Sequence, residues 1–153
     1  MTDHENWGTD LRLLGDLERQ NDRQRGSDLF TRRVPVTSAI DLETLVGREN
    51  LQQALLLRFL TPQGELEILG HTAYGSRLYE LLGELNIERT HNRAKMYVLQ
   101  ALAMEPRVGR VLSVVVTQNR MVREQMDIDI WLTPIDSDTP LNLVFPFFLE
   151  GGV

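Results

Sequence analysis

The sequence predicts an α+β domain, with helices packed on one face of a small antiparallel or mixed sheet. Two observations lead to this prediction. Apolar residues recur at helical spacing between residues 50 and 104, whereas after residue 107 they alternate with polar residues. Because the helices come first and the strands follow in succession, the sheet should be covered by helices on one side. The length of 153 residues suits one domain with an extension.

Residues 1–40 are expected to form a partly flexible N-terminal extension ahead of the α+β domain at residues 41–153. The apolar side chains of this extension first fall at helical spacing, at Trp7, Leu11, Leu14 and Leu17. This spacing favours a short amphipathic helix at Thr9–Arg19. Residues 19–28 carry no large apolar side chain, which is typical of a solvated linker. Because so short a helix is marginal alone in water, we expect the segment to dock on the domain or on a partner.

Three helices are expected from residue 50 onward. Asn50 can cap a helix that runs to Leu60, where a Thr-Pro step stops it. The segment TPQGELEIL should then form a turn and a short strand, and a second helix should follow at Tyr74–Leu85. A longer helix at Ile87–Met104 places its apolar residues on one stripe. These helices would supply the layer that covers the sheet.

Three strands are expected next, at Val108–Gln118, Gln125–Thr133 and Leu141–Leu149. The side chains expected on the buried face are Leu112, Val114 and Val116 in the first strand, and Met126, Ile128, Ile130 and Leu132 in the second. Asp127, Asp129 and Trp131 should face the other way. Pro146 cannot donate to a ladder, so the third strand is expected to lie at an edge or to end there.

The composition excludes several classes of protein. Without cysteine there can be no disulfide framework, iron–sulfur site or thiolate nucleophile. The apolar runs are too short to cross a membrane and the start lacks a signal peptide, so a cytoplasmic protein is expected. A net charge of −6 argues against binding of nucleic acid. All but one of the 16 basic residues are arginines, which suits pairing at protein interfaces or follows from a GC-rich genome.

No catalytic or metal-binding constellation is expected, and no cofactor. The three histidines, His4, His71 and His91, lack metal-ligand spacing, and Ser76, which follows Gly75 in a YGSRL segment, has no nucleophile-elbow pattern. The remaining candidates are pairs of alternating carboxylates that could in principle act on a sugar: Glu65 with Glu67, and Asp127 with Asp129. Alternating acids on the open face of a sheet are more often merely solvated.

The tripeptide Glu105-Pro106-Arg107 lies at the expected junction of the long helix and the first long strand. Pro106 disfavours helical conformation at Glu105, so the helix should end there. In an extended segment Glu105 and Arg107 project to the same side, and the rigid proline presents their charges together. Two interpretations stay open. The pair contacts a partner, or the two charges pair with each other or with nearby side chains as a helix stop.

Several segments occur in one order along residues 41–149: NLQQALLLRFLTPQGEL, HTAYGSRLYELLGE, a long helix, ALAMEPRV, VLSVVVT and MDIDIWL. In this order they resemble the small baseplate wedge family of contractile phage tails, type VI secretion systems and extracellular contractile injection systems. That family has long carried a "lysozyme-like" label. The combination of the TPxGEL turn, the YGSRL segment and the EPR step makes the resemblance far more specific than any one motif.

The resemblance implies a structural baseplate protein without enzymatic activity, present in several copies in a ring. Members of this family bind the larger wedge subunits and support the first ring of the sheath. Their sheet resembles the strand-exchange domain of the sheath protein, which can add strands to it. The family's motif falls on Glu105, Pro106 and Arg107, which are therefore expected to contact the wedge. A peptidoglycan-cleaving enzyme and a regulatory anti-adaptor of the same fold stay open as alternatives, and no membrane insertion is implied.

Overall fold

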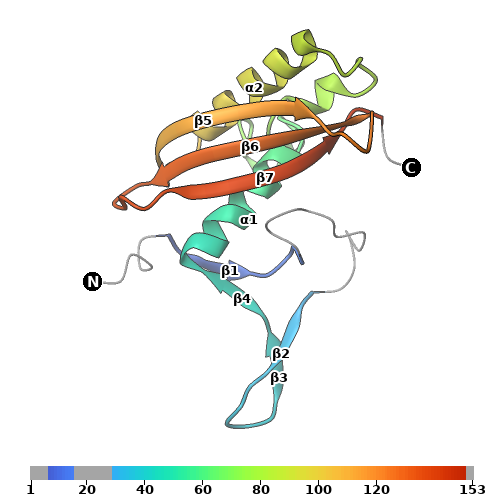
Figure 1. Cartoon of the computed structure of the whole chain (residues 1–153). Coiled ribbons are helices and arrows are strands. Elements are labelled where there is room, and N and C mark those ends of the chain that lie inside the picture. Colours follow the sequence, from blue (N-terminus) through green and yellow to red (C-terminus); the bar gives the residue numbers. More distant parts are fainter. Residues whose placement is uncertain (1–6, 16–28, 151–153) are drawn as a thin grey trace.

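A three-stranded antiparallel sheet forms the centre of the structure (Figure 1). The computed structural model describes residues 7–15 and 29–150. β5 (Val108–Gln118), β6 (Gln125–Pro134) and β7 (Leu141–Phe148) pair in chain order, so β6 is the central strand. The three strands expected from the alternating pattern are confirmed, and β7 with its proline lies at an edge.

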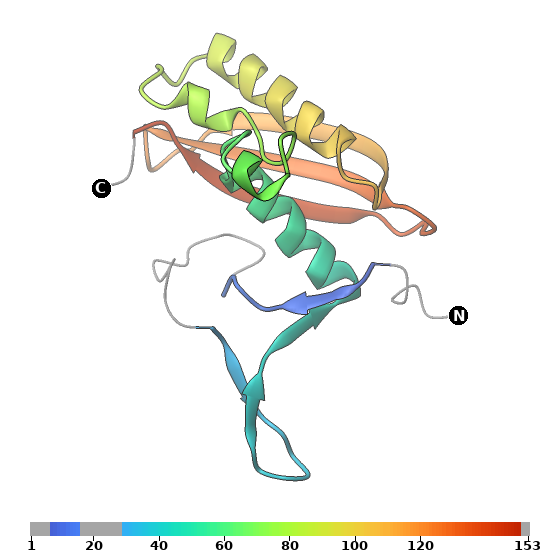
Figure 2. The same ribbon diagram turned by 180° about the vertical axis from the view of Figure 1, so that it is seen from behind.

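Two helices, α1 (Gly47–Leu60) and α2 (Glu88–Ala103), lie on the same face of this sheet, as the view from behind shows (Figure 2). The opposite face carries no helix among the described residues (Figure 1). The α+β class and the one-sided covering of the sheet are therefore confirmed. α1 crosses the strands obliquely, and Phe59 near its end stacks on Phe145 of β7 with 5.1 Å between ring centroids.

The alternation predicted for the central strand is confirmed. The side chains that it buries completely are Met126, Ile128, Ile130 and Leu132. They pack in one core with the buried faces of the two helices, which include Leu51, Leu55, Val98 and Leu102. Trp131, on the other face of β6, is 43% exposed.

In β5 the prediction is wrong for Leu112, which is 46% exposed. Val111 lies opposite Leu132, and Ser113 lies opposite Trp131, so β5 contains one more residue than β6 in this interval. Such a bulge shifts the alternation by one position, so Val111 packs against the core in place of Leu112. Beyond the bulge the predicted phase holds, because Val114 is buried and Val116 is partly buried.

The first and third predicted helices are confirmed, but with changes at their ends. α1 begins at Gly47 instead of Asn50, and its N-cap residue Val46 makes no side-chain cap. Asn50 therefore lies within the first turn of the helix, where its buried side-chain amide donates to the carbonyl of Trp7 at 3.0 Å. α2 ends at Ala103, close to the expected stop before Pro106.

The segment between the helices differs from the prediction. The short strand expected in TPQGELEIL is a turn followed by a single 3-10 turn, η1 (Glu67–Leu69). The helix expected at Tyr74–Leu85 is also wrong, because only η2 (Leu78–Leu81), another 3-10 turn, forms there. The glycines at both ends of that segment adopt positive φ angles, +105° at Gly75 and +83° at Gly83, and such angles interrupt a helix.

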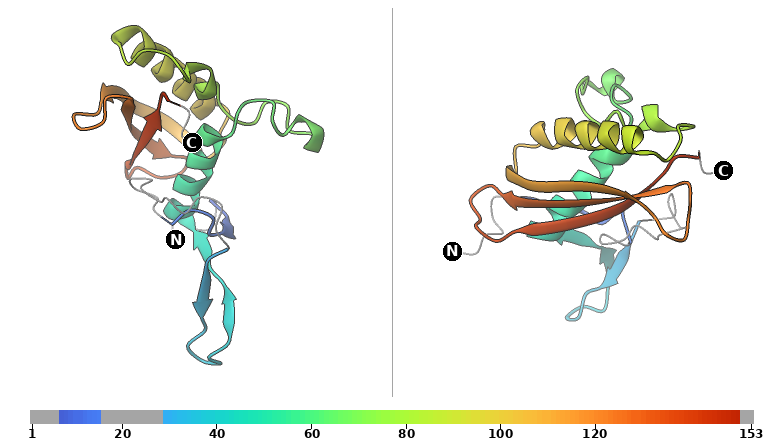
Figure 3. Two further views of the ribbon diagram at one scale, coloured as in Figure 1. Left: turned by 90° about the vertical axis from the view of Figure 1, so that its right-hand side faces the viewer. Right: turned by 45° about the horizontal axis from the view of Figure 1, so that its top comes forward.

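Gly75 allows the chain to return to the end of α1. A Cβ atom there would lie only 2.5 Å from the carbonyl oxygen of Thr61. Ser76 donates its amide to Thr61 at 2.9 Å, its carbonyl accepts from Gln63, and its hydroxyl donates to Phe59 at 2.7 Å. The TPxGEL and YGSRL segments are thus bonded to each other, and the loop between them projects from the body with η1 at its tip (Figure 3).

The N-terminal helix predicted at Thr9–Arg19 is wrong over its first turn, because Thr9–Leu11 is a strand, β1. β1 pairs antiparallel with β4 (Thr44–Val46). Gln53 of α1 fixes the chain beyond β1, accepting from the amide of Leu13 at 2.7 Å and donating to the carbonyl of Leu11 at 2.8 Å. These contacts with the body outweigh the local helical spacing. Residues 12–15 are not helical either, whereas residues 16–19 of the predicted helix and the linker at 19–28 lie outside the described residues.

A second hairpin, β2 (Thr31–Arg33) with β3 (Ile40–Leu42), extends away from the body (Figure 1). Ile40 and the tip residue Val36 are both exposed. An isolated two-stranded hairpin is at best marginally stable in water, so a binding partner would stabilise it. The hairpin spans residue 40, where the extension was expected to end. The division of the chain at that point stays a prediction.

The register of β6 predicts that Ile130→Asp unfolds the domain, because it places an unpaired charge in the core at a cost of about 4 kcal/mol or more. Asp129→Leu on the adjacent, open face should remain folded, losing one hydrogen bond from Asn142 at a cost of about 1 kcal/mol. Circular dichroism and urea denaturation measure both. A stably folded Ile130→Asp protein would contradict the register.

Candidate functional site

The Glu105 side chain is buried at the junction of α2 and β5, with the residue 6% exposed. Its two oxygens accept from two different arginines. Oε1 accepts from Nε of Arg107 at 2.7 Å, and Oε2 accepts from Nη2 of Arg58 at 3.2 Å. Pro106 ends the helical path, so the chain turns at Glu105 and brings Arg107 back beside it. The carboxylate thus bridges a guanidinium from α1 and one from Arg107, the residue just before β5.

Arg58 is itself only 8% exposed. Its guanidinium lies over the ring of Tyr74, 4.6 Å from the ring centroid. The buried Nε of Arg58 has no hydrogen-bond partner among the described residues. The cluster therefore contains two positive charges, one negative charge and an N–H group without an acceptor. We call these four residues, Arg58, Tyr74, Glu105 and Arg107, the Arg58 cluster.

Arg107 joins this cluster to the N-terminal segment. Its Nη1 donates to the carbonyl of Trp7 at 3.2 Å, the same carbonyl that accepts from Asn50. The Trp7 ring is buried and its Nε1 donates to the carbonyl of Ile135 at 3.2 Å. The backbone of Ile135 in turn donates to Arg107 at 2.8 Å. Trp7 is therefore hydrogen-bonded to Asn50 of α1, to Arg107 just before β5 and to Ile135 just after β6.

The electrostatics of the Arg58 cluster favour an ionised Glu105. Burial works to raise the pKa of the Glu105 carboxyl, but the hydrogen bond and charge of Arg107, together with the charge of Arg58, outweigh it. The pKa of Glu105 therefore lies below its ordinary value of 4.5. For Tyr74, burial raises the pKa above 10.0, although the charge of Arg58 opposes this, so its hydroxyl is neutral at pH 7.

Of the three predicted site residues, Glu105 and Arg107 are brought together and Pro106 is exposed. The internal pairing that was one of the two interpretations is present. The surface that a partner can reach here consists of Pro106 and the part of Arg107 that remains exposed, 27% of its side chain. A contact between these residues and a wedge subunit stays a prediction.

Sequence reasoning gave no functional role to Arg58 or Trp7. A signal for Arg58 was present, because it follows Leu51 and Leu55 at helical spacing and so falls on the apolar stripe of α1. A charge on such a stripe requires a buried counter-ion, and Glu105 is that counter-ion. The contacts of Trp7 with Arg107 and Ile135 join residues 100 and 128 positions apart, and no local pattern indicates them.

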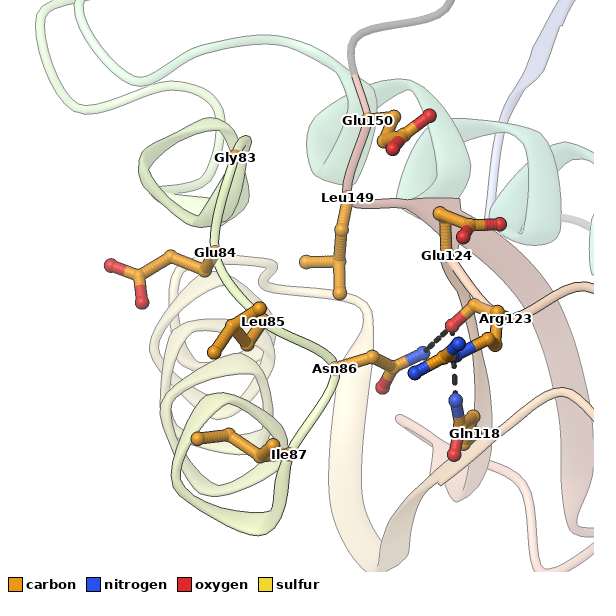
Figure 4. Close-up of a pocket in the computed structure, with 10 residues that line it drawn as sticks. All are labelled: Gly83, Glu84, Leu85, Asn86, Ile87, Gln118, Arg123, Glu124, Leu149 and Glu150. Atoms are coloured by element: carbon orange, nitrogen blue, oxygen red, sulfur yellow. Dashed lines mark hydrogen bonds between the residues drawn. The ribbon is translucent and has the colours of Figure 1, made fainter.

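A cavity near the other end of the sheet has a volume of about 470 Å³ (Figure 4). It lies among the turn at residues 83–87, the β5–β6 hairpin and the chain after β7. Asn86 and Gln118 both donate to the carbonyl of Arg123, at 2.7 and 3.1 Å. These polar side chains therefore hold the hairpin in place, and Leu85 and Ile87 supply an apolar wall.

The paired carboxylates considered in the sequence are bound by amide side chains in one case and lie outside any strand in the other. Asp127 accepts from Asn119 at 2.7 Å and from Gln125, and Asp129 accepts from Asn142 at 2.6 Å. Glu65 and Glu67 do not share a strand face, since their segment is a turn and a 3-10 turn. Over residues 7–15 and 29–150 there is no cluster of three or more metal-ligating side chains. No helix in these residues has the length and apolarity to cross a membrane.

Comparison with known proteins gives a similarity among solved structures. No protein-family profile matches the chain, and no curated protein does. Among solved structures, the chain resembles a protein from Geobacter sulfurreducens named "putative tail lysozyme". The TM-score is 0.57 and the identity 24%, over 66% of this chain and 89% of the other. The two proteins share a fold.

Replacing Glu105 by alanine should destabilise the domain by about 3–5 kcal/mol, because Arg58 would then be a buried charge without a counter-ion. Arg107→Ala should cost less, since Glu105 retains Arg58 and Arg107 is partly exposed. Urea denaturation of the three proteins measures these differences. Equal stability of Glu105→Ala and the unsubstituted chain would show that the buried pairing is not needed for folding.

The low pKa of Glu105 predicts a specific dependence of stability on pH. Its contribution is complete above the unfolded value of 4.5 and disappears as the pH falls through the lower folded value. Glu105→Gln has no carboxyl group at this position to titrate. As the pH falls from 5 to below 4.5, this variant should therefore lose less stability than the unsubstituted chain. Thermal melts at several pH values measure this. Parallel pH profiles would contradict it.

Proposed function

We propose that this chain is a structural subunit of a contractile tail or tail-like particle, placed in the baseplate wedge below the first sheath ring. The observation that carries the proposal is the fold shared with the Geobacter protein, whose name refers to a tail. The order of the TPxGEL, YGSRL and EPR segments, which resembles the baseplate wedge family, supports the more specific role. In this proposal the chain acts in the cytoplasm by binding other subunits and not by catalysis.

The edge strand β5 is the proposed site for strand addition by a sheath subunit. Within the described residues β5 pairs only with β6, which leaves its outer edge open. From Ser113 to Gln118 the β5–β6 register is regular, without a bulge. A regular unpaired strand is what β-augmentation requires.

The other edge strand, β7, is less suited to strand addition. Pro146 has no N–H group to donate. Two side chains of α1 also bind carbonyls at the start of β7: Arg48 donates to Pro140 at 2.6 Å and Gln52 to Asn142 at 3.4 Å. The difference between the two edges therefore favours addition of a strand along β5 rather than along β7.

The proposed wedge contact uses the surface of the Glu105-Pro106-Arg107 turn. Glu105 would act from within, since its carboxylate holds Arg107 at 2.7 Å beside the exposed Pro106. The larger wedge subunits would then contact Pro106 and Arg107. The exposed β2–β3 hairpin offers a second surface for subunit contacts.

A second candidate function, cleavage of peptidoglycan, is favoured only by the name of the Geobacter protein. It would require a pair of carboxylates about 5–9 Å apart across a sugar-binding cleft. The best-placed pair, Asp127 and Asp129, is held by side-chain amides on the open sheet face. A muramidase assay on the purified chain decides this candidate, with Asp127→Asn as the control for contaminating activity.

Strand addition predicts that Val116→Pro prevents sheath binding. Asn119 donates across to Gln125, and alternate residues in an antiparallel strand point their N–H groups to opposite sides. The N–H of Val116 therefore faces the free edge, and its loss leaves the β5–β6 ladder intact. After co-expression with candidate sheath and wedge proteins, this variant should bind the sheath protein at least about tenfold more weakly than the unsubstituted chain.

Val116→Ala is the matched control, because it shortens the same side chain and keeps the N–H group. It should bind the sheath protein as the unsubstituted chain does. Circular dichroism confirms that both variants are folded. Normal sheath binding by a folded Val116→Pro protein would exclude strand addition at β5.

A further inference from the structure

We propose that the pocket beside Arg58 binds a carboxylate group of a partner protein. The pocket is a cavity of about 260 Å³ at the base of the projecting loop. Its walls are Arg58, Tyr74, Met104 and residues 70–73. This inference rests on the proposed function in one respect, namely that the carboxylate comes from another subunit of the assembly. The binding of a carboxylate is a property of the chain alone.

The charges of the Arg58 cluster are unbalanced, and the imbalance lies beside the pocket. Glu105 is shared by two arginines, so one positive charge is left without a counter-ion within the cluster. Arg58 is more than nine-tenths buried, and its Nε–H has no acceptor in the described part of the chain. A buried cation that is only half paired is costly. An added anion would remove that cost.

The position of the guanidinium favours a planar, singly charged ligand. Tyr74 covers one face of the Arg58 guanidinium at 4.6 Å, which fixes the plane of the group and leaves its edges for hydrogen bonds. Arginine binds carboxylates through such edges. The Tyr74 hydroxyl is neutral and makes no hydrogen bond in the described residues, so it can also donate to an anion.

The loop that forms the outer wall adds backbone donors. Thr72 and Ala73 both line the pocket, and within the described residues neither amide N–H has a hydrogen-bond acceptor. The neighbouring His71 amide is already used, because it donates to Leu66 at 3.1 Å. Main-chain N–H groups beside an arginine are a common arrangement for anions.

The size of the pocket favours a side chain or chain end over a free metabolite. Pockets for small-molecule ligands usually measure 300–1,000 Å³ and enclose most of the ligand. A cavity of about 260 Å³ is smaller than this range and suits one carboxylate with its short stem. The pocket also lies close to the exposed turn at Pro106, because Arg58 and Arg107 bind the same carboxylate. A partner on that turn would reach both.

Nuclear magnetic resonance of the ¹⁵N-labelled chain tests the proposal without a known partner. Sodium acetate is the probe, titrated at constant ionic strength against sodium chloride. The expected result is a saturable shift of the Arg58 Nε–H and of the Thr72 and Ala73 amides, with a dissociation constant on the order of 10–100 mM. No shift in acetate, or the same shift in chloride, would overturn the proposal. Tighter binding of inorganic phosphate would overturn the preference for a carboxylate.

A carboxylate placed in the pocket by substitution gives a second test. Met104 lines the pocket and is 53% exposed, so Met104→Glu should fold and supply the anion in cis. It should abolish the acetate-induced shifts and raise the melting temperature, although an acid at the C-terminal end of α2 is otherwise unfavourable. Met104→Gln, uncharged and of the same shape, should still respond to acetate. An undiminished response in Met104→Glu would contradict the site.

The same two variants separate this inference from the proposed function. In the co-expressed assembly, Met104→Glu should weaken binding of a wedge partner and leave sheath binding by β5 unchanged. If no particle assembles with the unsubstituted chain, the proposed function fails while the acetate titration still stands. If acetate has no effect while the particle assembles, the site fails and the proposed function stands.

Discussion

The pairing of one buried carboxylate with two arginines is the interaction on which the arrangement of this protein depends. The charge of buried Glu105 requires counter-ions, and these come from α1 and from Arg107, the residue just before β5. The three elements must therefore meet at one point. Since Arg107 also binds the backbone of Trp7, the same requirement extends to the N-terminal segment. A tripeptide at a helix end thus organises contacts across the whole domain.

The sheet built on this junction has two unlike edges and two unlike faces. One face is covered by α1 and α2, and the other exposes Trp131 and Val115 beside amide-bound carboxylates. At its start β5 carries a bulge, and bulges are one of the means by which proteins protect sheet edges. The remaining part of β5 lacks this protection. The regular, unpaired stretch of sheet edge is therefore confined to β5 within the described residues.

The sequence was informative wherever a long periodic pattern matched the local environment. β6 alternates without interruption because both of its neighbours are strands, and α2 keeps one apolar stripe because it lies flat on the sheet. The pattern failed where tertiary contacts override it. The spacing of Trp7, Leu11 and Leu14 is helical, yet hydrogen bonds to Gln53 and to β4 make the segment extended.

The candidate site shows the same division. The helix stop at Glu105 and its pairing with Arg107 follow from local geometry and could be predicted. The second partner of the carboxylate could not, because Arg58 is 47 positions away and only the folded chain brings it near. Likewise, the need for glycine at position 75 becomes clear only in the folded chain, where the carbonyl of Thr61 lies too close for a Cβ atom. The parts of the site that no motif contains are formed by contacts between segments that are distant in the sequence.

The two tryptophans lie in opposite environments, and this gives the protein two separate optical reporters. Trp7 is 2% exposed and is anchored through its ring N–H to Ile135, so its fluorescence depends on whether the N-terminal segment is seated. Trp131 lies on the open face of the central strand, so its fluorescence emission depends on whether that face is exposed to water or covered. Docking of the segment at Trp7 and covering of the open sheet face can therefore be followed independently in the natural sequence.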